Sequence, residues 1–132
     1  MFLTKDQILQ ADDLKFSEVD VPEWGGKVRI KTMTGEERDA FEDKIVVRDK
    51  DGNRKGMDIK NFRAKLLVRT IVDEEGKRVF DEQDIHALGM KSSAALDRVA
   101  EEVQEINRLR AQDVEELTST LEPGQSEDST SD

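Results

Sequence analysis

The spacing of hydrophobic residues changes along the chain between the period of a strand and the period of a helix. Residues 15–21 and 27–33 alternate apolar and polar positions, and the turn-forming sequence PEWGG joins them. This pattern predicts an N-terminal β-hairpin over residues 15–33. Upstream, Thr4 and Gln7 have the spacing of a capping box, which predicts a short helix over residues 5–11.

Side-chain pairing predicts a register for this hairpin. A loop centred between Trp24 and Gly25 places apolar pairs on one face and oppositely charged pairs on the other: Val21 with Val28, Val19 with Ile30, Asp20 with Arg29, and Glu18 with Lys31. Such cross-strand pairs each contribute about 0.2–1 kcal/mol, and here they agree with one another. Phe16 falls on the charged face, and this register does not explain its place there.

Helical spacing dominates the rest of the chain. Apolar residues recur every three or four positions in four segments, which predict helices over about 35–48, 58–70, 82–88 and 94–117. The first of these helices begins at a second capping box, formed by Thr34 and Glu37. A hydrophilic loop, RDKDGNRKG, occupies residues 48–56. The turn DEEGK, between the apolar pairs at 71–72 and 79–80, predicts a small second hairpin.

These elements predict a small α+β fold that is mostly helical, with the N-terminal hairpin packed against the helices. We expect a single domain over residues 1–117, because a chain of 132 residues has the usual size of one domain. From Thr118 onward the sequence TSTLEPGQSEDSTSD is polar and acidic and has almost nothing to bury. Residues 118–132 are therefore predicted to form a disordered acidic tail.

Charge separates the body of the chain from this tail. The net charge is −10, yet seven acidic residues and no Lys or Arg lie between positions 113 and 132. The first 112 residues carry 21 basic and 24 acidic side chains and are nearly neutral. Nucleic-acid binding needs clustered Lys and Arg, so it is not expected. No segment resembles a signal peptide or a membrane span, so we expect no membrane association and a protein that stays in the cytosol.

Residue types suited to catalysis or metal binding are scarce. The chain has no cysteine and a single histidine, His86, without the partner residues of a catalytic triad. The run DKDGN at 49–53 resembles the start of a calcium loop, but Arg54 and Lys60 occupy the positions that need glycine and glutamate. We therefore expect no catalytic residue, no metal site and no cofactor, and a protein that is not an enzyme.

Two features suggest a surface that binds a partner protein. Trp24 in the hairpin turn either covers the core or anchors a partner, since tryptophan is enriched at interface hot spots. A stripe at helical spacing in the last predicted helix is either a core face or a seam for another protein. The predicted partner-binding residues are Trp24, Leu96, Val99, Val103, Ile106 and Leu109.

The order and spacing of several short motifs resemble those of a known family. VPEWGGKV at 21–28 is followed by MTGEERDAFE at 33–42, by VDEEGKRVF at 72–80, and by the pair Leu88-Gly89. Together they resemble the tail assembly chaperones of bacteriophages with long, non-contractile tails, over about residues 1–115. No single motif is chemically diagnostic, because each of them is turn or capping sequence.

The resemblance implies a non-catalytic protein that binds the long, hydrophobic tape measure protein, keeps it soluble, and helps tail tube subunits polymerise around it. It also implies homo-oligomers, association with a frameshift-extended form, possible contact with the major tail tube protein, and location in the host bacterial cytoplasm with absence from the mature virion. Amphipathic helices and a net negative charge suit a chaperone for a helical client.

Two other classes of protein stay open on the sequence. One is a small structural component of the virion, such as a head–tail connector or a tail completion protein. The other is an acidic inhibitor that imitates DNA, which the nearly neutral body disfavours.

Overall fold

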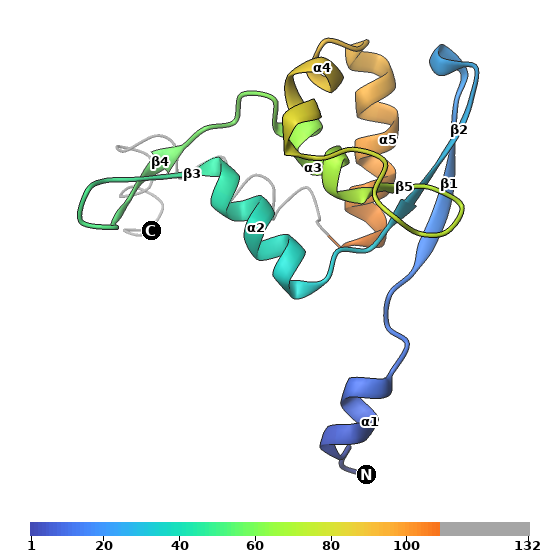
Figure 1. Ribbon diagram of the computed structural model, residues 1–132, viewed down its shortest axis with the longest axis vertical. Helices are drawn as coiled ribbons and strands as arrows, with labels where there is room; N and C mark the ends of the chain where they lie inside the picture. The colour runs from blue at the N-terminus through green and yellow to red at the C-terminus, as the bar shows by residue number, and fades with distance from the viewer. Residues whose placement is uncertain (109–132) are drawn as a thin grey trace, which may run out of the picture.

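The fold is α+β, as predicted, with an N-terminal hairpin beside a group of helices (Figure 1). The structure, a computed structural model, describes residues 1–108. In chain order the elements are α1 (Lys5–Gln10), β1 (Phe16–Val21), a 3₁₀ turn (Pro22–Trp24), β2 (Gly26–Lys31), α2 (Gly35–Ile45), β3 (Val46–Arg48), β4 (Arg54–Met57), α3 (Phe62–Thr70), β5 (Ile71–Val72), a second 3₁₀ turn (Glu82–Asp84), α4 (Ile85–Gly89) and α5 (Ser93–Ile106). The predicted tail at 118–132 lies outside the described residues.

β1 and β2 form the predicted hairpin in a register that differs by two residues from the predicted one. The observed partners include Val19 with Val28, Val21 with Gly26, Glu18 with Arg29, and Asp20 with Lys27. The predicted register is wrong because residues 22–25 form the loop, with a 3₁₀ turn followed by Gly25 in the left-handed region at φ 76°. A shift of two residues keeps every side chain on its own face, so both registers satisfy the same apolar and charge pattern.

Phe16 lies on the charged outer face of the hairpin because it has a partner there. The guanidinium carbon of Arg29 lies 4.2 Å from the centre of the Phe16 ring, a distance typical of a cation–π contact. The turn after β5 also approaches this ring: a Cβ added at Gly76 would lie 3.3 Å from Phe16 Cζ. Gly76 itself has φ of +84°, a conformation that favours glycine.

β5 makes the sheet three-stranded, in the order β1-β2-β5. It pairs antiparallel with β2 through Ile71 opposite Ile30 and Val72 opposite Arg29. The predicted small second hairpin is present: Val72 and Arg78 form a bridge, flanked by hydrogen bonds from Asp73 N to Lys77 O at 2.8 Å and from Val79 N to Ile71 O at 3.1 Å. The prediction missed β2 as the main partner of β5. Two apolar residues can be buried against a strand far away in the sequence as well as against a neighbouring one.

Residues 46–57 form a two-stranded sheet of β3 and β4 in place of the predicted helix end and loop. α2 begins at the predicted capping box but ends at Ile45, so its predicted extension to residue 48 is wrong. Two consecutive β-branched residues, Val46 and Val47, favour a strand at this point. The Asp49 carboxylate accepts hydrogen bonds of 2.9 Å from the backbone N–H groups of Asp51 and Asn53, so it shapes the turn between the strands.

α3 begins at Phe62, four residues after the predicted start. Asn61 before it adopts a left-handed conformation at φ 57°, and the carboxylate of Asp58 accepts a hydrogen bond from Lys60 N in a tight turn. The predicted start at residue 58 is therefore wrong, because local side-chain bonding favours a turn there. The predicted helix at 82–88 is a 3₁₀ turn over Glu82–Asp84 that continues into α4.

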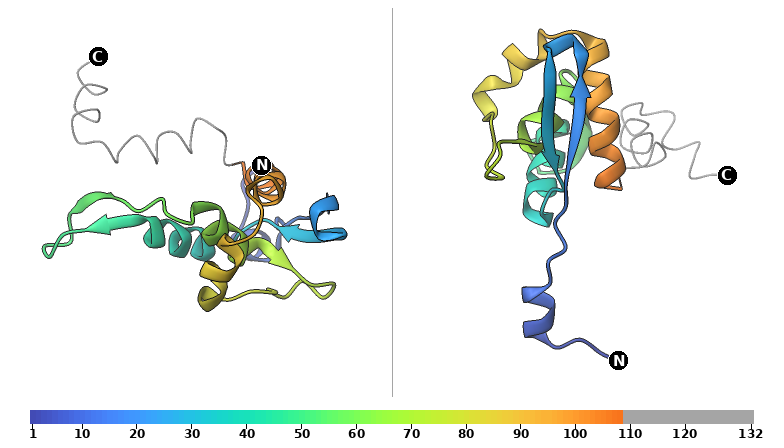
Figure 2. Two further views of the ribbon diagram at one scale, coloured as in Figure 1. Left: turned by 90° about the horizontal axis from the view of Figure 1, so that it is seen from above. Right: turned by 90° about the vertical axis from the view of Figure 1, so that its right-hand side faces the viewer.

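α3 is the centre of the core. Seven of its nine residues, from Ala64 to Thr70, are buried, so the helix is covered on all sides. Figure 2 shows the β1–β2 hairpin lying across it, with α5 on one side and α4 on the other. Phe41 of α2 meets Phe62 edge-on, with ring centres 5.5 Å apart.

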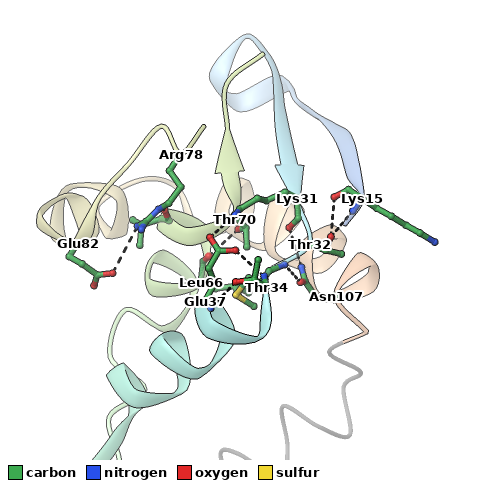
Figure 3. Close-up of polar contacts among 12 residues, drawn as sticks. Lys15, Lys31, Thr32, Thr34, Glu37, Leu66, Thr70, Arg78, Glu82 and Asn107 are labelled. Atoms are coloured by element: carbon green, nitrogen blue, oxygen red, sulfur yellow. Dashed lines mark hydrogen bonds and ion pairs between the residues drawn. The ribbon is translucent and has the colours of Figure 1, made fainter. Parts of the chain in front are cut away.

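Asn107 joins the end of α5 to the end of β2 (Figure 3). Its side-chain oxygen accepts a hydrogen bond of 2.6 Å from Met33 N, and its side-chain nitrogen donates to Lys31 O at 3.3 Å and to Val103 O at 2.9 Å. Nearby, Lys15 at the start of the hairpin is fixed by Thr32, whose backbone N–H and hydroxyl both donate to Lys15 O. These contacts hold the open end of the hairpin against the helices.

Candidate partner-binding surface

Trp24 is positioned at the tip of the β1–β2 hairpin, in the 3₁₀ turn. Its neighbour Glu23 is held by Arg98 of α5, which donates two hydrogen bonds of 3.2 and 3.0 Å to the two carboxylate oxygens. These bonds lower the pKa of Glu23 below its usual value and raise that of Arg98. Trp24 is half-buried and packs against the core, and the rest of its surface lines two grooves. The tip is thereby tied to α5 while part of the indole stays accessible.

The first groove lies between the hairpin tip and α4, and we call it the α4 groove. It has a volume of about 320 Å³ and is lined by Trp24, Phe80, Asp84, Ala87, Leu88 and Lys91. Its walls are mainly apolar, with one carboxylate and one ammonium group at the margin. This volume is at the lower end of the range of small-molecule sites and suits a few apolar side chains of a partner segment.

A second groove continues from the first, because Trp24 and Phe80 line both. It has a volume of about 430 Å³ and extends along β2 and β5. This groove is also lined by the apolar side chains of Val28 and Ile71 and by charged side chains of the hairpin. The two grooves together form an apolar depression with charged margins on the face that carries Trp24 and Phe80.

The segment that carries Phe80 is tied to α3 by charged side chains. Arg69 of α3, which is 5% exposed, pairs with Glu82 at 2.5 Å. Arg78 donates a hydrogen bond of 2.8 Å to Val68 O (Figure 3 shows the Arg78 and Glu82 side chains). Hydrogen bonds to charged groups are among the stronger ones, so this segment has a defined position on the body.

The structure places the predicted partner-binding residues in three different environments. Leu96, Val99 and Val103 are buried in the core, at 5%, 0% and 0% exposure, so no partner reaches them in this conformation. This stripe is a core face. Ile106 is half-buried against the core, near the end of α5. The helix predicted to reach residue 117 ends at Ile106, because Asn107 caps it and Arg108 is left-handed at φ 56°. Leu109 and the residues after it lie outside the described residues.

Sequence reasoning did not find Phe80, Ala87, Leu88 and Lys91 as companions of Trp24. Phe80 follows the VDEEGKRV turn, and Leu88 is an apolar position of a short helix, so each resembled ordinary core sequence. Their approach to Trp24 depends on how α4 packs against α3, which no local pattern encodes. The adjacent Ala87 and Leu88 carry no sequence signal that distinguishes a groove wall from an ordinary amphipathic helix.

Within residues 1–108, no group of three or more His, Asp and Glu side chains is arranged to hold a metal ion. Among the helices that the structure describes, none is both long enough and apolar enough to cross a membrane.

Both the sequence and the fold are similar to those of known proteins. Residues 5–120 match the family model described as phage tail assembly chaperone. No curated protein matches the sequence. Among solved structures, the tail assembly chaperone of bacteriophage HK97 is similar, with a TM-score of 0.50 and 16% identity over 76% of this chain and 94% of that chain. At this identity, the likeness shows a shared fold.

Proposed function

The chain belongs to the phage tail assembly chaperone family, and from this premise we propose that it binds the tape measure protein of its phage and keeps it soluble until tail tube subunits assemble around it. The proposed role is non-catalytic. The client is expected to present apolar helical segments, which bind proteins by placing one apolar face into a groove.

The observation that supports this role is the depression on either side of Trp24. Trp24 and Phe80 are both half-buried, so they offer aromatic surface to a partner without being removed from the core. Aromatic anchors in a partly desolvated groove are typical of interface hot spots. Asp84 and Lys91 at the margin are suited to orient a bound helix through its charged residues.

The remaining parts of the proposal concern assembly. We propose that the chain forms homo-oligomers, associates with a frameshift-extended form, and promotes tube assembly, with the major tail tube protein as a further contact. It acts in the host bacterial cytoplasm and leaves before the virion is complete. Mass spectrometry of purified virions is expected to find none of this protein. Its presence at a fixed copy number would instead identify a structural connector or tail completion protein.

Co-expression with the tape measure protein tests the proposed function. The chain is expected to bring that protein into the soluble fraction and to co-elute with it in size-exclusion chromatography. Ala87→Glu places a charge in the α4 groove without removing a core side chain, because Ala87 is exposed. This variant is expected to lose co-elution while its circular dichroism spectrum is unchanged.

A matched control keeps this test specific. Gln83→Glu adds the same charge four residues earlier, at an exposed position that does not line the groove. It is expected to behave like the wild-type protein. Equal co-elution of the two variants would contradict the groove assignment, and an insoluble client beside a folded wild-type chain would contradict the proposed function itself.

A further inference from the structure

The first fourteen residues form an arm that exposes large apolar side chains. Met1, Phe2, Leu3, Ile8 and Leu9 are 102%, 98%, 62%, 57% and 71% exposed. No residue of α1 is buried. Figure 1 shows the arm extending away from the body at the open end of the hairpin, opposite the tip that carries Trp24. Large apolar side chains gathered on one exposed segment of a small protein are typical of an interaction site.

The arm has a defined conformation although it buries nothing within its own chain. Thr4 Oγ1 accepts a hydrogen bond of 3.2 Å from Gln7 N, and Gln7 Oε1 accepts one of 2.9 Å from Thr4 N, so both halves of the capping box are made. Leu3 before the cap and Ile8 after it have the spacing of a hydrophobic staple. A helix of six residues is marginal in water when isolated, so these local devices fit a segment that completes its packing on another surface.

The arm is too short to place its helix in the α4 groove of its own chain. Lys15 is fixed to Thr32 by backbone and hydroxyl hydrogen bonds, so the arm can swing only upstream of Lys15. Five fully extended steps from Lys15 back to Gln10 span about 17 Å. The six strand steps from Lys15 to Val21 span about 20 Å, and Trp24 lies beyond them. Ile8 and Leu9 therefore do not reach the α4 groove of their own chain, although a second copy can offer it.

We propose that the arm of one copy docks in the α4 groove of a second copy, with Ile8 and Leu9 against Trp24, Phe80 and Ala87. The two surfaces match in chemistry, since the arm offers aliphatic side chains and the groove is mainly apolar. At the groove margin, Lys91 is opposite in charge to Asp12 and Asp13, which follow the arm helix, and Asp84 is opposite in charge to Lys5 within it. In this assignment, the exposed arm of one copy and the accessible groove of another cover each other.

The position of the two surfaces determines the kind of assembly. The arm and the groove lie at opposite ends of the hairpin, so the contact is heterologous, with a different surface contributed by each copy. Heterologous contacts produce closed rings or open chains, according to whether the rotation between copies closes. This contact rests on the self-association that is part of the proposed function. It adds that the client and the arm of a second copy compete for the α4 groove.

Disulfide trapping tests this contact directly, because the native chain has no cysteine. A Leu9→Cys chain and an Ala87→Cys chain, distinguished by mass, are mixed under mild oxidation. The expected product is a crosslinked heterodimer, formed at least fivefold more than from Leu9→Cys mixed with Val47→Cys. Val47 is exposed on the distant β3–β4 hairpin and serves as the control position. Equal crosslinking at both positions would overturn the proposal.

The double variant Leu9→Cys/Ala87→Cys, oxidised at low concentration, distinguishes the two possible sources of the arm. Monomers with an internal disulfide would show that the arm docks in its own chain and would overturn the proposal. Crosslinked oligomers without internal disulfides would support it.

Analytical ultracentrifugation without any client provides a second readout. Ile8→Ser/Leu9→Ser is expected to shift the wild-type oligomer to monomer, whereas Lys5→Ser/Gln10→Ser, which changes polar positions of the same helix, is expected to leave it assembled. An Ile8→Ser/Leu9→Ser protein that stays oligomeric would overturn the proposal. Because no client is present, a persistent oligomer would not contradict the proposed chaperone function. Conversely, failure of the chain to solubilise the client would not contradict the arm contact.

Discussion

The side chain of Asn107 accepts a hydrogen bond of 2.6 Å from the backbone N–H of Met33, although 74 positions separate the two residues in the sequence. Asn107 lies just after α5, and Met33 lies just after β2. The same amide also donates to Lys31 O and to Val103 O. One side chain thereby satisfies backbone groups at the ends of two elements and fixes the angle between α5 and the hairpin.

Asn107→Ala is expected to lower the free energy of unfolding by about 1–3 kcal/mol, because it leaves partly buried backbone groups without their partner. Urea unfolding followed by circular dichroism measures the loss. Glu105→Ala, at an exposed position of the same turn, is the control and is expected to change stability by less than about 0.5 kcal/mol. Equal losses in the two variants would contradict the role assigned to the Asn107 amide.

Glu37→Gln is expected to make stability less dependent on pH. Burial of Glu37 raises its pKa, but the hydrogen bonds from Lys31 and Thr34 outweigh burial and hold the pKa below the usual glutamate value. A lowered folded-state pKa gives stability that is present at neutral pH and is lost as pH falls through that pKa. The variant keeps the capping box, so the loss of about 1–2 kcal/mol expected at pH 7 reports the charged contact with Lys31.

This difference between wild type and Glu37→Gln is expected to shrink as pH falls from the usual glutamate range towards the lowered folded-state pKa of Glu37, where the carboxylate takes up a proton. Thermal unfolding at pH 7, 5 and 3 measures it. Glu36→Gln removes a charge at the exposed neighbouring position and serves as the control. A gap that stayed constant down to pH 3 would show that the Glu37 charge contributes nothing.

Gly76→Ala is expected to destabilise the protein more than Gly52→Ala. Both glycines follow an aspartate turn of the same design and have nearly equal left-handed φ values, +84° and +85°. The backbone strain of about 1–2 kcal/mol is therefore common to both variants. A Cβ at Gly76 also meets the Phe16 ring, whereas one at Gly52 meets nothing within 4 Å. Denaturant unfolding of both variants measures the difference in free energy of unfolding. Equal losses of stability in the two variants would contradict the contact between Phe16 and the Gly76 turn.

Val103→Asp is expected to prevent folding, because Val103 is fully buried and an unpaired carboxylate in the core is strongly destabilising. Ile106→Asp, at a half-buried position one turn later, is expected to fold with a smaller loss. Circular dichroism distinguishes these outcomes. A folded Val103→Asp protein would contradict the core assignment, and client binding by folded Ile106→Asp tests the predicted contact role of Ile106.

Sequence pattern was sufficient for features that depend on neighbouring residues. The capping boxes at Thr4 and Thr34 are present as predicted, because each is complete within four residues. The hairpin is present for the same reason. Its register was not predictable, since charge and hydropathy repeat every two residues and a shift of two satisfies both.

Features that depend on distant packing were beyond sequence reasoning. Ile71 and Val72 pair with β2 because their position directly after α3 places them beside that strand. Their own sequence does not indicate β2 as the partner. The α4 groove likewise arises where the hairpin tip meets α4, which begins 61 positions along the chain from Trp24. Trp24 lines this groove and its partner-binding role stays a prediction, whereas the regular stripe of α5 packs into the core against α3 and β1.

The emission of Trp24 measures the central claim most directly, because it is the single tryptophan of the chain and it lines the α4 groove. A tryptophan-free apolar helical segment of the tape measure protein is titrated into the folded protein. A saturable blue shift of Trp24 emission is predicted, lost in Ala87→Glu and kept in Gln83→Glu. Binding of the segment, seen by co-elution, without any change in Trp24 emission would contradict the account.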